Sequence, residues 1–142
     1  MGKVKDILQS KGNNVYSVEP TIMVYQAIEQ MCEKNIGGLL IVHAGRLEGI
    51  FTERDYARKL ILKGKSSKTT PISDLMTKNP ITVTPENSIE DCMNVMTSKF
   101  IRHLPVVEGN TLMGLISIGD VVKQIIEEQK SIIEHLENYI SR

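Results

Sequence analysis

The sequence lacks an excess of charge of either sign. It has 17 Lys and Arg residues against 17 Asp and Glu residues, which gives a formal net charge of +0. Without a net positive charge, no long-range field draws the chain to nucleic acid or to an anionic membrane surface. We therefore expect no nucleic acid and no membrane among its partners.

Long apolar runs are also missing. The longest, residues 36–42, is broken by two glycines and is far shorter than the roughly 18–20 residues of a membrane span. The first residues contain no apolar signal-peptide region. Cys32 and Cys92 have no CxxC spacing and fall among apolar residues of expected helices, so we predict two reduced, buried thiols. These features predict a cytoplasmic protein.

Sets of residues that carry out chemistry are equally scarce. His43, His103 and His135 have no metal-ligand spacing and no cysteine neighbours that suit zinc. No Ser/His/Asp or Cys/His set can be assembled. Gly64-Lys-Ser66 resembles the end of a Walker A loop, but Lys59 stands where that motif needs its first glycine. We therefore expect no metal site, no required cofactor and no enzymatic activity.

What the sequence does contain is an internal repeat. One offset, 112 − 47 = 65 residues, relates the matching segments from Val18 onward. The matched pairs are Val18–Pro20 with Val83–Pro85, Leu47–Gly49 with Leu112–Gly114, and Thr52–Asp55 with Ser117–Asp120. One copy of about 60 residues would be marginally stable alone, so we predict two repeats, 1–66 and 67–142, that share one core.

Each copy has the pattern β-α-β-β-α. An apolar helical periodicity is followed by two short apolar runs around a turn, which is typical of a β-hairpin. A second helix is expected from about Glu53 in one copy and Ile118 in the other, and Ser88-Ile-Glu-Asp91 is expected to cap the first helix of the second copy. The last helix continues far beyond Asp120. One of its faces carries an apolar stripe, part of which we expect to face another subunit: Ile125, Gln129, Ile132, Ile133, Leu136 and Ile140.

These segments resemble the tandem cystathionine-β-synthase (CBS) domain pair, or Bateman module. Residues 72–85 resemble the opening of a CBS repeat, Ile101–Val107 its central strand and Gly114–Asp120 its strand-to-helix junction. The first copy is weaker, with Gly37-Gly38 in place of Arg102-His103, but it ends in Thr52-Glu-Arg-Asp55. The resemblance implies an α/β (α+β) fold of two repeats packed as a pseudo-two-fold pair. It is similar to stand-alone bacterial CBS-pair proteins.

The resemblance also implies a ligand class and two clefts between the copies. CBS pairs bind adenosyl molecules such as AMP, ADP, ATP, NAD or S-adenosylmethionine. By resemblance, the first cleft is formed by Thr52, Arg54, Asp55, Ile81, Thr82, Arg102 and His103. The second is formed by Tyr16, Ser17, Ile36, Gly37, Gly38, Ser117, Gly119 and Asp120.

The Ser/Thr-x-x-Asp element has a physical rationale of its own. An ionised Asp55 or Asp120 presents two acceptor oxygens to the two hydroxyls of a ribose, and the helix N-terminus beside it suits a phosphate. The same element is also an ordinary helix N-cap. Both interpretations can hold at once.

The two clefts are expected to differ. Arg102 is the natural phosphate partner in the first cleft because its guanidinium is always charged, although a solvated surface arginine is the plain alternative. His103 is as compatible with packing as with phosphate binding. Gly37 and Gly38 give the second cleft no positive side chain, so we expect it to bind more weakly, to take a ligand with fewer phosphates or more bulk, or to stay empty.

Two functions follow from these features. The first is a regulatory module that senses cellular energy or redox state by binding an adenine nucleotide and acts in trans on a separate protein. The alternative is a structural dimerisation or interaction module whose clefts bind nothing. In either case we expect a homodimer.

Overall fold

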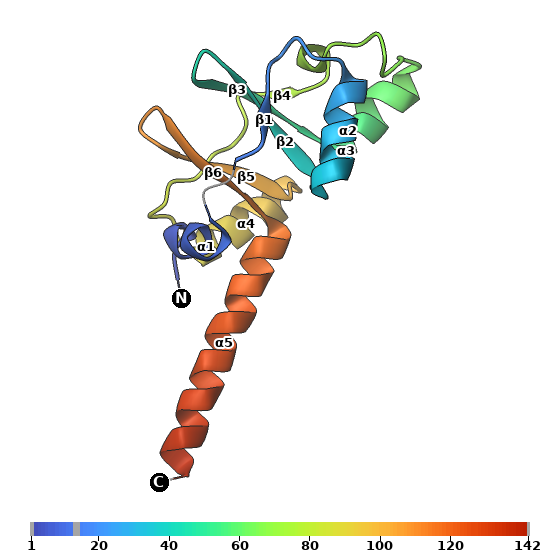
Figure 1. Ribbon diagram of the computed structural model, residues 1–142. Coiled ribbons are helices and arrows are strands. Elements are labelled where there is room, and N and C mark those ends of the chain that lie inside the picture. The colour runs from blue at the N-terminus through green and yellow to red at the C-terminus, as the bar shows by residue number, and fades with distance from the viewer. Residues whose placement is uncertain (1, 13–14, 142) are drawn as a thin grey trace. The chain divides into compact units, whose positions relative to one another are not determined.

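The two repeats fold with the same order of elements (Figure 1). The computed structural model describes residues 2–12 and 15–141. The first repeat contains β1 (Ser17–Val18), α2 (Val24–Lys34), β2 (Gly38–His43), β3 (Arg46–Thr52) and α3 (Glu53–Asp55). The second contains an isolated bridge at Val83, then α4 (Ile89–Lys99), β5 (His103–Glu108), β6 (Thr111–Ser117) and α5 (Ile118–Ile140). The α+β class and the β-α-β-β-α order are confirmed.

The lead-in segment at the start of each repeat, before its β-α-β-β-α elements, packs with the other repeat. The first-repeat unit comprises Asn14–Ile81 and Asn110–Leu112. It includes the lead-in of the second repeat, which forms a 3₁₀ turn (Ile72–Asp74) and β4 (Thr77–Lys78). The second-repeat unit comprises Met1–Asn13, Thr82–Gly109 and Met113–Arg142, and it includes α1 (Val4–Lys11).

Each unit has a hydrophobic core of its own, so the prediction of one shared core is wrong. The core of the first-repeat unit includes Leu39, Ile41 and Phe51 from the strands and Ile72 from the lead-in, all completely buried. In the second-repeat unit, Val4 of α1 joins Leu104 and Val121. The exchanged lead-ins add apolar surface that a 60-residue copy alone would not have.

The first-repeat unit is built on a four-stranded sheet in the order β1-β2-β3-β4. β1 runs parallel to β2, and β2 pairs antiparallel with β3, with Gly38 opposite Thr52. β4 closes the sheet, pairing antiparallel with β3 at Gly49 and Ile50. After α3 the chain continues as a π-helical turn (Tyr56–Leu60) and a 3₁₀ turn (Ile61–Lys63).

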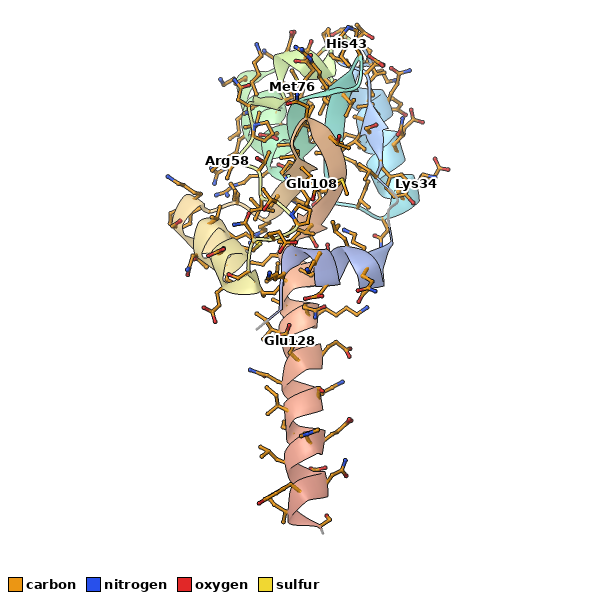
Figure 2. All side chains as sticks on the ribbon, turned by 90° about the vertical axis from the view of Figure 1, so that its left-hand side faces the viewer. Lys34, His43, Arg58, Met76, Glu108 and Glu128 are labelled. Carbon is orange, nitrogen blue, oxygen red and sulfur yellow. The ribbon has the colours of Figure 1, made fainter. Side chains whose placement is uncertain are left out.

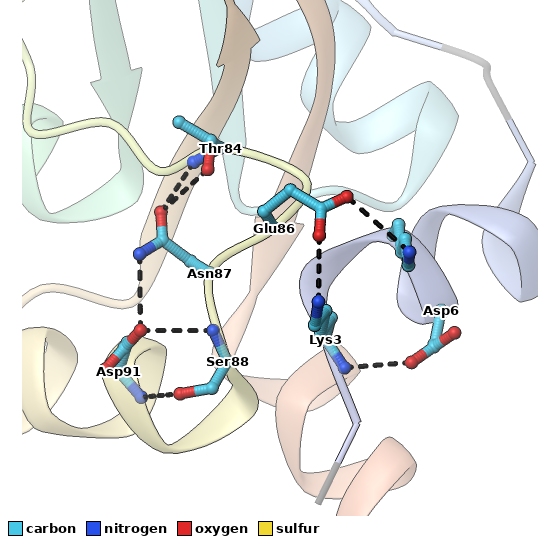
Figure 3. Close-up of polar contacts among 8 residues, drawn as sticks. Lys3, Asp6, Thr84, Glu86, Asn87, Ser88 and Asp91 are labelled. Atoms are coloured by element: carbon cyan, nitrogen blue, oxygen red, sulfur yellow. Dashed lines mark hydrogen bonds and ion pairs between the residues drawn. The ribbon is translucent and has the colours of Figure 1, made fainter.

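In the second-repeat unit, β5 and β6 form a two-stranded sheet, with α1, α4 and α5 beside it (Figure 1). α4 begins with the predicted capping box. The Ser88 hydroxyl accepts from the Asp91 amide at 3.0 Å, and the Asp91 carboxylate accepts from the Ser88 amide at 3.1 Å (Figure 3). Beside this network, Lys3, the residue before α1, forms an ion pair of 2.9 Å with Glu86 (Figure 3).

The two cysteines differ, contrary to the prediction that both are buried. Cys92 is fully buried, and this burial, with a contribution from the Asp91 charge, raises the pKa of its thiol to about 11. Cys32 is exposed. It follows Met31, the last buried residue of α2, so its side chain turns off the buried face of that helix.

α5 has 23 residues and is the longest helix. Its Val121 is completely buried, whereas Val122 and the residues after Gln124 are at most partly covered. No helix among residues 2–12 and 15–141 has both the length and the low charge that crossing a membrane requires.

Two equivalent glycines give a test of this packing. A Cβ on Gly49 would lie 2.7 Å from the backbone oxygen of Thr77, whereas a Cβ on Gly114 would lie 2.7 Å from Cδ2 of Leu8. The Leu8 side chain can rotate away from an added methyl group at Gly114. The backbone of β4 cannot move away from one at Gly49, because β4 is paired with β3. We expect Gly49→Ala to lower the free energy of unfolding by about 1–3 kcal/mol and Gly114→Ala to lower it by less, both measured by urea unfolding. Equal losses would contradict this assignment.

Candidate functional site

The first candidate carboxylate lies where β3 turns into α3. Thr52 has extended backbone geometry and acts as the N-cap, and Asp55 stands one turn later. The Thr52 amide donates to Asp55 Oδ2 at 2.9 Å, and the Asp55 amide donates to the Thr52 hydroxyl at 3.3 Å. The capping interpretation of Thr52-Glu-Arg-Asp55 is therefore confirmed.

The remaining acceptor positions of the Asp55 carboxylate are also occupied. Lys59, one turn further along, lies 3.0 Å from Oδ1, and the Thr77 hydroxyl donates to the same oxygen at 3.3 Å. The Thr52 hydroxyl adds a contact of 3.2 Å to Oδ2. Only 11% of the Asp55 side chain is exposed. A carboxylate has about four acceptor sites, so a ribose diol could bind here only by displacing one of these groups.

The second candidate carboxylate lies at the equivalent turn from β6 into α5. The Ser117 amide donates to Asp120 Oδ2 at 2.8 Å, and the Asp120 amide donates to the Ser117 hydroxyl at 3.2 Å. Lys11 of α1 donates to the same Oδ2 at 2.7 Å and to the Leu115 carbonyl at 2.8 Å. Burial acts to raise the pKa of Asp120, but the hydrogen bonds and charge of Lys11, with those from Ser117, hold it below its usual value.

The two carboxylates thus differ in their capacity to accept further hydrogen bonds. Both oxygens of Asp55 have partners. At Asp120 both contacts fall on Oδ2, and Oδ1 has no partner among residues 2–12 and 15–141. With 23% of its side chain exposed, Asp120 can accept a hydroxyl without first losing a contact.

The backbone amides at the two helix starts are partly used within each unit. The Glu53 amide donates to the Gly37 carbonyl at 3.2 Å, and the Ile118 amide donates to the Arg102 carbonyl at 2.9 Å. These bonds satisfy one of the amides that a helix start leaves without an intrahelical partner. At α5 the Gly119 amide has no partner in the part of the chain that the structure describes. It is the amide most available to an anion.

The structure brings some predicted residues together within each unit. Gly37 lies beside Glu53, Gly38 pairs with Thr52, and the backbone of Arg102 lies beside the start of α5. The Lys34 ammonium lies 5.3 Å from the centre of the Tyr16 ring.

Exposure varies among the predicted residues. Ser17, Arg54, Ile81, Thr82, Arg102 and Gly119 are exposed, whereas Ile36 and His103 are half-buried. Each predicted cleft combines residues of both units, so the two clefts stay predictions.

Three residues that contact the carboxylates were missed by the sequence argument. Lys59 follows Asp55 by four residues and could have been found from helical spacing. Lys11 and Thr77 carry no such signal, because each comes from the lead-in of the other repeat. Among the described residues, no three His, Cys, Asp or Glu side chains gather as metal ligands would.

Comparison with known proteins agrees with this architecture. A model of the CBS domain family matches residues 4–62 and 72–127. The CBS domain-containing protein CBSX3, mitochondrial, of Arabidopsis thaliana is 39% identical, and the match covers 96% of this chain and 71% of the relative.

Solved structures are similar over most of the chain. A protein with CBS domains from Burkholderia ambifaria MC40-6 is 46% identical with a TM-score of 0.86, covering 89% of this chain and 96% of that one. A CBS domain pair solved in complex with 5′-methylthioadenosine and S-adenosyl-L-methionine is 26% identical with a TM-score of 0.78, covering 90% of this chain and 98% of that one.

The lowered pKa of Asp120 predicts how stability depends on pH. A carboxylate whose pKa is lower in the folded than in the unfolded state stabilises the fold above its unfolded pKa, and this contribution is lost as pH falls through the folded pKa. We expect the free energy of unfolding of the wild type to exceed that of Asp120→Asn at pH 6, and the difference to shrink between about pH 5 and pH 2. Urea unfolding measures it.

Lys11→Met is the control for this prediction. It removes the cation that lowers the pKa of Asp120, so it should move the loss of stability to higher pH. A difference between wild type and Asp120→Asn that stays constant with pH would show that the charge of Asp120 contributes nothing.

Proposed function

Because this chain belongs to the CBS domain family, we propose that it is a regulatory module that binds an adenosyl ligand through Asp55 and Asp120. One observation carries this proposal. Both repeats place an ionisable aspartate at the same strand-to-helix turn, one turn into the helix and on an N-cap hydroxyl. Such a carboxylate offers two acceptors to the 2′ and 3′ hydroxyls of a ribose.

The adenosyl class is supported by a relative of the same fold. The CBS domain pair that contains 5′-methylthioadenosine and S-adenosyl-L-methionine shares 26% of its residues with this chain. AMP, ADP, ATP, NAD and S-adenosylmethionine all contain the same adenosine unit. They differ in the charge attached to its 5′ position, where Arg54 and Arg102 are the proposed partners.

The contacts of the two carboxylates favour tighter binding of the ligand at Asp120 than at Asp55. Its Oδ1 is open, and the Gly119 amide beside it is available to an anionic group. Binding at Asp55 must displace Lys59 or Thr77 from Oδ1. This order reverses the expectation, drawn from Gly37 and Gly38, that the second cleft is the weaker one.

Displacement at Asp55 would also give the ligand a structural effect. Lys59 donates to the Leu75 carbonyl at 3.1 Å and to Thr77 at 3.3 Å, so it joins the turn after α3 to β4. A ligand that takes over Asp55 Oδ1 alters this connection. A ligand shifts a conformational equilibrium only by binding one state more tightly, and loss of these contacts would distinguish the ligand-bound state from the present structure.

The remaining features of this proposal come from the family and from the sequence. The chain senses energy or redox state, acts in trans on a partner protein, is not an enzyme and forms a homodimer. A cytoplasmic location stays a prediction, and the Arabidopsis relative is described as mitochondrial.

One observation favours the alternative, a structural module whose carboxylates only cap helices. Asp55 already has its full set of partners without any ligand. A helix N-cap typically stabilises a protein by about 0.5–2 kcal/mol, and each aspartate completes such a cap from position N3, which is sufficient reason for its presence. Ligand binding separates the two functions.

We expect an adenosyl compound at a hundred times its dissociation constant to stabilise the fold by about 2.7 kcal/mol. The measurement is a thermal shift with AMP, ADP, ATP, NAD, S-adenosylmethionine and 5′-methylthioadenosine. Asp120→Asn and Asp55→Asn should each weaken binding of the effective compound by about 10- to 100-fold, because each removes charge-assisted hydrogen bonds.

Asp91→Asn is the matched control. Asp91 caps α4 with the same Ser-x-x-Asp geometry (Figure 3) but lies outside the proposed clefts. It should lower the melting temperature and leave ligand affinity unchanged. If all three variants lose stability alike and keep the same affinity, or if no compound shifts the wild type, the structural module is the correct function.

A further inference from the structure

We propose that α5 pairs antiparallel with α5 of a second copy of this chain. This inference is independent of ligand binding. It starts from the length of the helix. The Gly2 amide donates to Glu128 at 2.7 Å, which ties the middle of α5 to the segment before α1. Beyond Glu128, labelled in Figure 2, α5 extends away from α1 and α4 (Figures 1 and 2), and every residue in 129–141 is exposed.

This exposed end carries large apolar side chains on one face. Ile132, Ile133 and Leu136 are 54–60% exposed, and Tyr139 and Ile140 are 77% and 80% exposed. A helix of about 12 residues is marginal in water without a packed apolar face. A partner surface on this face would therefore stabilise the end of α5.

The apolar residues recur every seven positions, which is the pattern of helices that pack along their length. Starting the heptad at Val122 as position a, Gln129 and Leu136 are the next a residues. The d positions are Ile125, Ile132 and Tyr139, and the e positions are Ile126, Ile133 and Ile140. Three of every seven positions form one continuous stripe, broken only by Gln129.

The orientation follows from position e. In a parallel pair, position e of one helix lies beside position g of the other, so Ile133 would face the charged Glu128. In an antiparallel pair, e lies beside e, and Ile126 of one helix meets Ile133 of the other. Every a residue then also finds a d residue, because 122 + 139, 125 + 136 and 129 + 132 all equal 261. The e residues of the stripe therefore meet apolar partners only when the two helices are antiparallel.

The half of the stripe nearer the unit is open to receive the partner. Val122 and Ile126 are 42% and 46% exposed, and they are the residues that Tyr139 and Ile133 of a reversed copy would cover. Ile125 also packs against the core of its own unit, so the paired helix would be anchored to the fold at each end. A second copy supplies both halves of this interface.

Sedimentation of the full chain tests the pairing. Ile133→Glu places a charge in the stripe and should raise the dissociation constant of self-association by on the order of a hundredfold or remove one step of assembly. Ser131→Glu introduces the same residue on the opposite face, at position c, and should leave the constant nearly unchanged. Both residues are exposed within one chain, so neither substitution disturbs a buried core and both variants should stay folded.

Disulfide formation tests the orientation, in a Cys32→Ser background because Cys32 is exposed. Chains with Ile126→Cys mixed with chains with Ile133→Cys should form a mixed disulfide. Leu136→Cys alone should not cross-link, because its copy in a reversed helix lies 11 residues, or about 16 Å, away. Cross-linking through Leu136→Cys would overturn the antiparallel arrangement. An Ile133→Glu variant that sediments like the wild type would show that something other than a second copy covers the stripe.

Discussion

The turn from strand to helix at Asp55 and Asp120 depends on one interaction, the reciprocal hydrogen bonding between an N-cap hydroxyl residue and an aspartate three positions later. This pair satisfies the amides that a helix start leaves without partners. It also fixes the carboxylate at the end of the hairpin and gives it a cation, Lys59 in one unit and Lys11 in the other. The same residues therefore start a helix, hold a lead-in segment and supply the carboxylates of the proposed ligand sites.

The exchange of lead-ins explains why this interaction has more than a local effect. Lys11 comes from α1, and Thr77 comes from β4, so each carboxylate binds a segment distant in the sequence. The same segments complete the two cores, through Val4 in one unit and Ile72 in the other. A group that competes for either carboxylate therefore acts on an element that its unit needs for packing.

The sequence predicted the features that depend on local rules. The starts of the second helices at Glu53 and Ile118 and the capping of α4 by Ser88 follow from hydrogen bonds within four residues. The burial of Cys32 was predicted wrongly. The repeat itself indicates the correct result, because the residue equivalent to buried Cys92 is Ala27 (92 − 65 = 27) and not Cys32. Lys11, Thr77 and the two separate cores could not be predicted, because long-range pairing between repeats leaves no periodic signal.

The asymmetry between the two carboxylates has a thermodynamic consequence for a sensor. Under the proposed function, a ligand at Asp120 would gain hydrogen bonds to an open oxygen, whereas a ligand at Asp55 would gain them only after the Lys59 ion pair or the Thr77 hydroxyl contact is lost. Identical intrinsic contacts would therefore give different apparent affinities, because the site at Asp55 must also be reorganised before it binds. Two sites of one chemistry would then respond over different ranges of ligand concentration. In this proposal, duplication supplies the two sites, and the different origins of Lys11 and Lys59 would separate their responses.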